Sequence, residues 1–171
     1  MVKVTALGNG EFRLRAACRN GRERISQISE LELSASGLKD TEETSLSNRA
    51  FIRHVASECD EIYGDSFERQ EGAVTKIGNN VSLVFKAMDF GEKGTCAVRI
   101  VGSTPLEKNS IHIRFSNGSQ EIRRIVEFGH CEGYEEQSFL FERVNGLQEV
   151  TFIFLPGSEF NFRDFIFVET E

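Results

Sequence analysis

Apolar residues recur at every second position along most of this chain of 171 residues. The pattern is clearest over residues 12–18, 31–35 and 111–115, where Phe, Leu, Ile, Ala or Cys alternates with charged or polar residues. Successive side chains of a β-strand point to opposite faces, so this alternation predicts strands that each bury one face. No long window with helical spacing is present, and we therefore expect an all-β protein.

Turn sequences separate the alternating segments. Asn20-Gly21 closes the first of them, and Asn117-Gly118 lies between residues 111–115 and 122–128. Asn-Gly pairs adopt the positive φ angles that tight hairpin turns require. The sequence therefore predicts a β-hairpin centred on Asn117-Gly118.

The C-terminal part of the chain contains a second predicted hairpin and a closing strand. Asn145-Gly146 lies between residues 139–141 and 150–154, and alternation returns over residues 162–168. Residues 42–65 fit both a helical face and a strand, and here we expect a strand followed by a long loop. About ten strands at this spacing predict a two-sheet β-sandwich.

Phenylalanine dominates the aromatic content. The chain has 15 Phe, no Trp and two Tyr, which are Tyr63 and Tyr134. Two packed sheets need large apolar side chains between them, so we expect most of these rings in the core.

The charge distribution argues against several classes of partner. The net charge is -7, with acidic residues spread over the whole length, whereas nucleic-acid binding needs a clustered basic face. The arginines of residues 13–24 are interspersed with Glu and predict a solvated strand face. No run of about 18 apolar residues is present, so no membrane partner is expected. No signal-peptide pattern opens the chain.

The candidate nucleophiles and metal ligands form no recognisable motif. The four Cys never form a C-x-x-C pair, which predicts free buried thiols of a reducing, cytoplasm-like compartment, although two disulfides remain formally possible. The three His show no spacing typical of a nucleophilic triad, and no glycine-rich phosphate motif occurs. We therefore expect no catalytic residues and favour a binding or structural module.

Three stretches together resemble a known family. Residues 72–91, 144–154 and 160–167 are similar to the β-sandwich of carbohydrate-binding module family 6, although Arg163 stands where the family commonly has an acid. Residues 5–16 look like the last strands of a bacterial immunoglobulin-like repeat. The combination is similar to the C-terminal region of glycoside hydrolase family 2 β-galactosidases.

This resemblance implies a domain organisation and a role. Residues 1–24 would be N-terminal strands left from a preceding immunoglobulin-like domain, and residues 25–171 would be a two-sheet jelly-roll β-sandwich. The module would not be catalytic. It would hold an oligosaccharide, with a galactoside suspected, near the catalytic domain of the same parent chain.

The resemblance also points to binding residues at a loop-end cleft. Asn161 matches the C-terminal Asn of the family, and Tyr134 falls in the region where the family often has a stacking aromatic residue. Asn80 lies on the opposing loop, and Tyr63 would supply the second ring. The alternative from the residues alone is that Tyr134 is a half-buried strand residue and that Asn161 only bends the chain.

A structural calcium ion is a further implication of the family resemblance. Glu30 and Glu32 share one strand face, and Asp164 lies on the closing strand that would neighbour it. Carboxylates are ligands that Ca²⁺ prefers. The alternative is that Glu30 and Glu32 form the polar face of an edge strand.

A structural module is the rival interpretation. The small number of Tyr and the absence of Trp favour a sandwich that packs against its parent enzyme or a second copy without affinity for sugar. Unpaired N-terminal strands would then promote a homodimer, because a free strand edge pairs readily with another chain. A free-standing hydrolase is a third and weaker alternative.

Overall fold

The computed structural model describes residues 2–8, 11–19, 25–34 and 49–170, which belong to two compact units, Met1–Ser45 and Leu46–Glu171. In the described part of the chain, no helix has the length and apolar character that crossing a bilayer requires. Each unit is described by itself below.

The first unit contains one antiparallel sheet of three strands. They are β1 (Val2–Gly8), β2 (Glu11–Arg19) and β3 (Ile25–Ser34), in the order β1-β2-β3. The register places Leu14 opposite Leu31 and Arg15 opposite Glu30. Asn20-Gly21 lies outside the described residues. Because β3 is hydrogen-bonded to β2, the boundary predicted after residue 24 falls inside this sheet, and the chain divides after Ser45 instead.

The second unit, called the sandwich unit below, begins with short elements. They are the 3-10 helix η1 (Arg49–Phe51), β4 (His54–Val55), the 3-10 helix η2 (Ala56–Glu58), β5 (Glu61–Tyr63) and β6 (Glu68–Gln70). Longer strands follow, namely β7 (Ala73–Ile77), β8 (Val81–Asp89), β9 (Thr95–Ser116), β10 (Glu121–Val144), β11 (Leu147–Phe154) and β12 (Phe160–Glu169). The long loop expected within residues 42–65 is thus divided by short strands and 3-10 turns.

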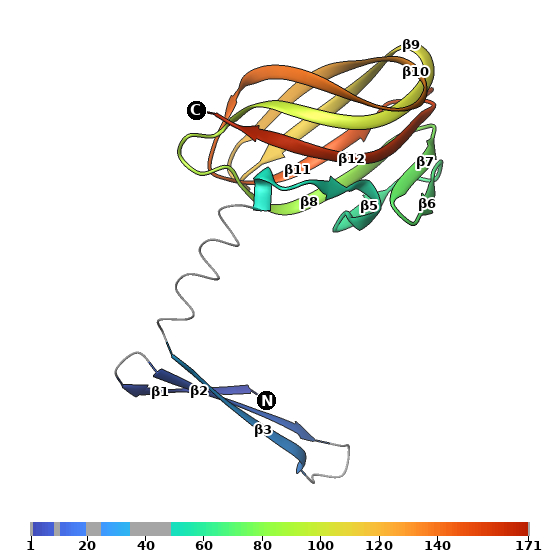
Figure 1. The fold of residues 1–171 in the computed structure, drawn as a ribbon. Helices are drawn as coiled ribbons and strands as arrows, with labels where there is room; N and C mark the ends of the chain where they lie inside the picture. Colours follow the sequence, from blue (N-terminus) through green and yellow to red (C-terminus); the bar gives the residue numbers. More distant parts are fainter. Residues whose placement is uncertain (1, 9–10, 20–24, 35–48, 171) are drawn as a thin grey trace. The chain divides into compact units, whose positions relative to one another are not determined.

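Two long strands, β9 and β10, belong to both layers of the sandwich (Figure 1). Residues 95–103 of β9 pair with β12, whereas residues 111–116 pair with β11. β10 follows β9 along both parts. One layer, called the β8 layer, continues through β11 and β8 to β5, and the other, the β12 layer, continues through β12 and β7 to β6. This curled sheet confirms the predicted two-sheet β-sandwich.

The first predicted hairpin is confirmed and the second is wrong. Ser116 pairs with Glu121 across the Asn117-Gly118 turn, and Asn117 Oδ1 accepts hydrogen bonds from two backbone N–H groups of that turn. Asn145-Gly146 does connect β10 to β11, but β11 pairs with β8 and β9 and not with β10. The alternation identifies both strands correctly, but the chain changes layers at this turn, which a local pattern does not encode.

Phenylalanine rings fill the space between the layers, as predicted. Ten of the 15 Phe are among the largest fully buried side chains. Many of the rings meet edge to face, for example Phe85 and Phe165, whose centroids lie 4.7 Å apart at an interplanar angle of 79°. Edge-to-face pairs of this kind add to the hydrophobic contribution of each ring.

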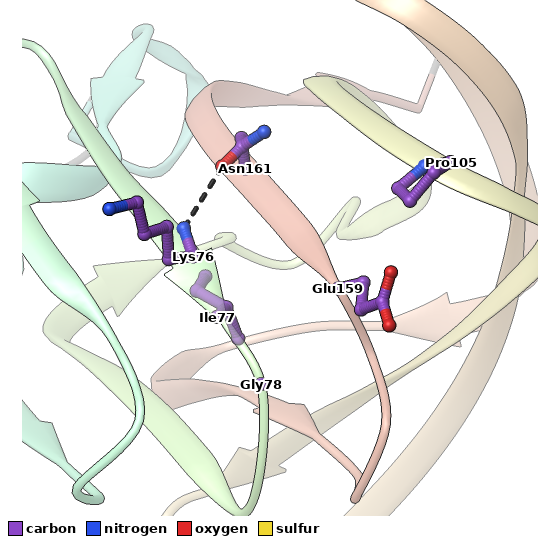
Figure 2. Close-up of a pocket in the computed structure, with 6 residues that line it drawn as sticks. All are labelled: Lys76, Ile77, Gly78, Pro105, Glu159 and Asn161. Carbon is purple, nitrogen blue, oxygen red and sulfur yellow. Dashed lines mark hydrogen bonds between the residues drawn. The ribbon is translucent and has the colours of Figure 1, made fainter.

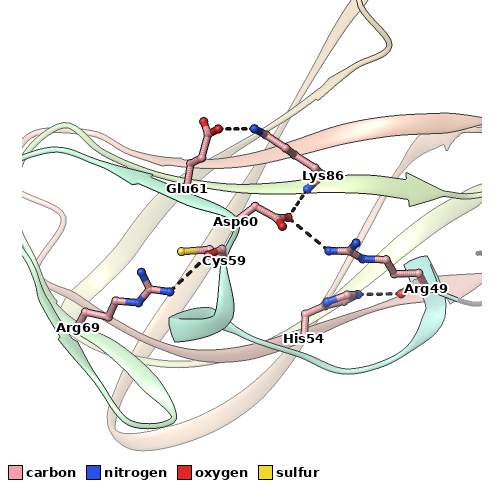
Figure 3. A network of polar contacts seen from close by, with 7 residues as sticks. All are labelled: Arg49, His54, Cys59, Asp60, Glu61, Arg69 and Lys86. Carbon is pink, nitrogen blue, oxygen red and sulfur yellow. Dashed lines mark hydrogen bonds and ion pairs between the residues drawn. The ribbon is translucent and has the colours of Figure 1, made fainter. Parts of the chain in front are cut away.

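Polar contacts attach the first part of the sandwich unit to β8 (Figure 3). The Asp60 carboxylate accepts a hydrogen bond from the Lys86 backbone N–H at 2.6 Å and forms an ion pair with Arg49 at 3.3 Å. The His54 ring stacks on Phe165 with the centroids 5.3 Å apart, and its Nε2 atom lies 2.8 Å from the Arg49 carbonyl oxygen. These contacts fix β4 beside β12.

Candidate functional site

Asn161 connects β12 to β7 and β9, and Figure 2 shows its hydrogen bond to Lys76 of β7. It lies at the start of β12 opposite Ser103 of β9. Its Oδ1 atom accepts a hydrogen bond from the Lys76 backbone N–H of β7 at 2.9 Å, and its Nδ2 atom donates one to Ser103 Oγ at 3.0 Å. The β7–β12 register is irregular here, between Phe160 and Phe162, so the side chain replaces a missing ladder contact. The second Nδ2 hydrogen has no acceptor among the described residues.

Two hollows meet at Asn161 and Pro105. The first has a volume of about 320 Å³, and its lining includes Lys76, Ile77, Gly78 and Glu159. The second has a volume of about 310 Å³, and its lining includes Ser103, Thr104, His130, Cys131 and Glu132. Both volumes lie at the lower end of the range for small-molecule sites. No Phe, Tyr or Trp lines either hollow, so stacking contacts with such a ring must come from beside them.

Two residues of the first hollow have a strained backbone. Lys76 and Glu159 have φ angles of 52° and 42°, which residues with a Cβ rarely adopt. Such conformations cost on the order of 1 kcal/mol or more and persist only where surrounding contacts enforce them. The hydrogen bond between Asn161 and Lys76 is one of these contacts.

Tyr134 lies on β10, within an irregular stretch of the β9–β10 pairing between Cys131 and Glu135. Its side chain is 41 % exposed, and the Arg163 guanidinium carbon lies 5.5 Å from the centre of its ring. Partial burial raises the pKa of Tyr134, and the positive charge of Arg163 opposes that shift. The ring is thus half-buried, and its phenol is neutral near pH 7.

Tyr134 and Asn161 lie on the same outward side of the β12 layer. On β12, Phe160 and Phe162 are fully buried while Asn161 and Arg163 point away from the core. Arg163 contacts Tyr134, which places that ring on the outward side as well. We call this surface the Tyr134 face. The structure therefore places Tyr134 and Asn161, the two residues on which the predicted sugar site most depends, on the same surface.

A charged network lies on the Tyr134 face. The Asp164 carboxylate, with its side chain 8 % exposed, forms ion pairs with Arg53 and with Arg163 Nε, the latter at 2.8 Å. Arg53 also binds Glu136 at 2.9 Å. Hydrogen bonds to Glu136 and Asp164 raise the pKa of Arg53. Arg99 lies 3.9 Å from Glu136 at the edge of the network.

The predicted calcium ligands occupy different units of the chain. Glu30 and Glu32 belong to β3, opposite Arg15 and Arg13 of β2. Asp164 belongs to β12, whose hydrogen-bonded neighbours are β4, β7 and β9. The expected pairing of these two strands is therefore not seen between the strands that the structure describes. The described residues also contain no cluster of three or more His, Cys, Asp or Glu suited to a metal. The calcium site stays a prediction.

Tyr63 and Asn80, the other two predicted sugar ligands, lie in the β8 layer. Tyr63 ends β5 beside Ser82 of β8, is 58 % exposed, and donates a hydrogen bond to the Glu61 carboxylate. Asn80 occupies the turn before β8 with a φ angle of 49°. Neither residue lines the two hollows at Asn161. The predicted set of four thus divides into two pairs.

The sequence patterns did not identify most residues of the hollows. Lys76, Glu159 and Glu132 look like ordinary solvated charges in the sequence, and His130 belongs to no recognisable motif. Their positions depend on the bends of β9 and β10, which bring residues 103–105 and 129–134 to the start of β12. The alternation of apolar and polar residues does not indicate the positive φ angles of Lys76 and Glu159.

Sequence comparisons identify no relative. No family model matches the chain, and no curated protein does.

Comparison with solved structures identifies the fold. A family 6 carbohydrate-binding module from Clostridium stercorarium, solved with cellobiose, has a TM-score of 0.59 at 22% identity over 71% of this chain and 95% of the module. One from Clostridium cellulolyticum, solved with xylose, has a TM-score of 0.59 at 23% identity over 70% and 98%. A β-1,3-glucan-binding module from Bacillus halodurans has a TM-score of 0.56 at 16% identity over 69% and 96%. The chain therefore contains a sandwich with the fold of family 6 carbohydrate-binding modules.

Proposed function

We propose that this protein is a non-catalytic carbohydrate-binding module that holds an oligosaccharide on the Tyr134 face. The observation that carries the proposal is the shared outward orientation of a half-exposed ring and an amide beside two hollows. A sugar has apolar C–H faces that pack on aromatic rings and hydroxyl groups that need hydrogen-bonding partners. Tyr134 would supply the first contact, and the unused Asn161 hydrogen, His130 and Glu132 would supply the second.

Structural neighbours of the chain support this role. The modules from the two Clostridium species were solved with cellobiose and xylose, and the Bacillus halodurans module binds β-1,3-glucan. Their identities to this chain are low, so the neighbours support the class of ligand and not the particular sugar. One available ring and a shallow site imply weak binding, because little ligand surface becomes buried.

The finer proposal concerns the parent protein and the sugar. The resemblance of residues 5–16 to an immunoglobulin-like repeat supports a glycoside hydrolase family 2 β-galactosidase as the parent. A galactoside is then the first ligand to test, and the catalytic domain of that chain is the expected partner.

Calorimetry of the whole chain tests the proposal. The ligands are a galacto-oligosaccharide, cellobiose, xylo-oligosaccharides and a β-1,3-gluco-oligosaccharide. We expect at least one to bind, and we expect Tyr134→Ala to abolish that binding. Tyr63→Ala is the matched control, since it removes an exposed ring of the β8 layer and should leave the affinity unchanged. If neither these four ligands nor the acidic sugars tested below bind, or if Tyr134→Ala retains full affinity, the proposal is wrong.

A structural module is the second candidate. It is favoured by the fact that both polar atoms of the Asn161 amide already bond to other strands. In that case the free N-terminal strands would promote the homodimer considered above. Light scattering at several concentrations, on the whole chain and on a chain without residues 1–45, would show a dimer that depends on these strands.

A further inference from the structure

We propose that the ligand of the Tyr134 face is an acidic oligosaccharide whose uronic acid carboxylate is bound by Arg163. This inference rests on the proposed function, since it names the class of sugar for the same site. It is argued from the surroundings of Arg163, whose guanidinium group lies over the Tyr134 ring.

Arg163 is held in place while its outer nitrogens stay available. The Nε atom binds the Asp164 carboxylate at 2.8 Å, and the guanidinium carbon lies 5.5 Å from the centre of the Tyr134 ring. The two terminal nitrogens have no hydrogen-bond partner among the described residues, and the side chain is 47% exposed. A guanidinium held in this way offers parallel N–H donors that match the two oxygens of a carboxylate. Little side-chain freedom is then lost when the ligand binds.

The local charge balance also favours an anion. The network on the Tyr134 face brings three guanidinium groups, of Arg53, Arg99 and Arg163, to two carboxylates, of Asp164 and Glu136. The network thus carries one positive charge in excess, although the whole chain has a net charge of -7. This local excess attracts an anionic group to the arginines of the network.

Acidic residues in the two hollows determine which end of the proposed ligand faces them. Glu132 lines one hollow, and Glu159 lines the other, where the Lys76 amino group is already paired with Glu68 at 2.7 Å. A carboxylate placed in either hollow would therefore be repelled. Sugar hydroxyl groups can instead donate hydrogen bonds to these two side chains. The geometry therefore directs neutral hydroxyl groups toward Asn161 and the uronic acid toward Arg163.

Two matched pairs of ligands test the inference by calorimetry. Tri-galacturonate is compared with its methyl ester, and xylotriose carrying a glucuronic acid branch is compared with xylotetraose. We expect one acidic member to bind about tenfold more tightly than its neutral partner, the size of one charge-assisted contact. The preference should shrink in 0.5 M salt, because exposed charges are then screened. A sulfated oligosaccharide tests whether any anion suffices, and binding as tight as that of the uronate would contradict the assignment to a carboxylate.

Variants assign the preference to Arg163. Arg163→Gln should remove the preference for the acidic ligand while the neutral ligand keeps its affinity. Arg123→Gln is the control, since Arg123 is an exposed arginine on the part of β10 that belongs to the β8 layer, and it should change nothing. Thermal unfolding of both variants checks that they fold.

The outcomes separate this inference from the proposed function. If wild-type protein binds acidic and neutral partners equally, or if Arg163→Gln weakens both alike, the carboxylate assignment is wrong while the sugar site stands. If the wild-type protein binds no sugar of either kind, the proposed function and this inference fail together.

Discussion

The interior of the sandwich and the Tyr134 face are built from the same strands but use different chemistry. Between the layers, Phe rings pack against one another, and ten of them are almost inaccessible to water. On the Tyr134 face the Tyr134 ring contacts Arg163, which belongs to a network of three arginines and two acids. The comparison shows that most Phe rings of the sandwich unit stabilise its core. We therefore expect the proposed ligand of the Tyr134 face to be recognised through charge and hydrogen bonds as well as through the Tyr134 ring.

One strand shows how both regions arise together. On β12, Phe160 and Phe162 enter the core, and the residues between and after them, Asn161 and Arg163, reach the Tyr134 face. Strand alternation thus couples the position of each ligand-facing group to a buried ring beside it. The predictions below separate the two contributions.

Removing a central ring should have the largest effect. Phe165 packs against Phe85, Phe152 and Phe162 and under the His54 ring. Phe165→Ala should lower the free energy of unfolding by about 3–5 kcal/mol, since it leaves a cavity. Urea unfolding followed by circular dichroism measures it. Tyr134→Ala should cost far less, and equal losses for the two variants would contradict the distinction between core and face.

Replacing a glycine by alanine should affect stability differently in the core and on the Tyr134 face. A Cβ atom on Gly102 would lie 2.3 Å from Phe160 Cζ, whereas one on Gly133 would have no neighbour within 4 Å. Gly102→Ala should therefore cost about 1–3 kcal/mol through overpacking, and Gly133→Ala should be nearly neutral. Thermal and urea unfolding compare them. A destabilised Gly133→Ala together with an unaffected Gly102→Ala would reverse the assignment of the two faces.

Lowering the pH should reduce the folding stability of the sandwich unit through His54, whose ring stacks on the core residue Phe165. Burial lowers the pKa of His54. In the unfolded chain the same group titrates near its ordinary value of about 6.5. Below that pH the unfolded chain binds a proton that the folded chain excludes, so stability falls as pH falls until the lowered pKa is reached.

Urea midpoints at pH 8 and pH 5.5 measure this effect for wild-type protein and for His54→Phe. The loss should be on the order of 1 kcal/mol for each unit by which the pKa is lowered. His54→Phe should show a smaller loss over this interval, because it has no group at this position to protonate. An undiminished pH dependence in that variant would assign the effect to other groups.

Surface ion pairs away from the Tyr134 face should contribute the least. Lys108 and Glu127 form an exposed pair at 2.9 Å on the β9–β10 hairpin. Exposed pairs of this kind contribute little because water already stabilises both charges. Lys108→Ala should leave the urea midpoint unchanged. A clear loss of stability would show that charge pairs outside the Tyr134 face matter as much as those on it.

The sequence predicted the class of fold and much of its core, because strand alternation and Asn-Gly turns are local signals. The hairpin at Asn117-Gly118 follows from such signals and is confirmed. The hairpin expected at Asn145-Gly146 depends on which strand β11 selects as a partner, and that choice is made by long-range packing against β8 and β9. The extent of β9 and β10, each continuous across both layers, was missed for the same reason.

For the candidate site, the resemblance identified Tyr134 and Asn161, which the structure places on one face. It did not identify Arg163 as the group above the ring, because in the sequence Arg163 only marks a departure from the family pattern. Contacts between β10 and β12 pass across β9 and have no local signature. Such cross-strand contacts become visible only when the strand order is known.

The sharing of β9 and β10 between layers has a consequence for how the sandwich unit assembles. Each layer contains part of β9 and part of β10. We therefore expect that neither layer forms completely without the other. Contacts between residues far apart in the chain must then be made together, which slows folding in proteins of this topology. We expect the sandwich unit to fold and unfold as one cooperative step, with the Tyr134 face forming only when the whole unit does.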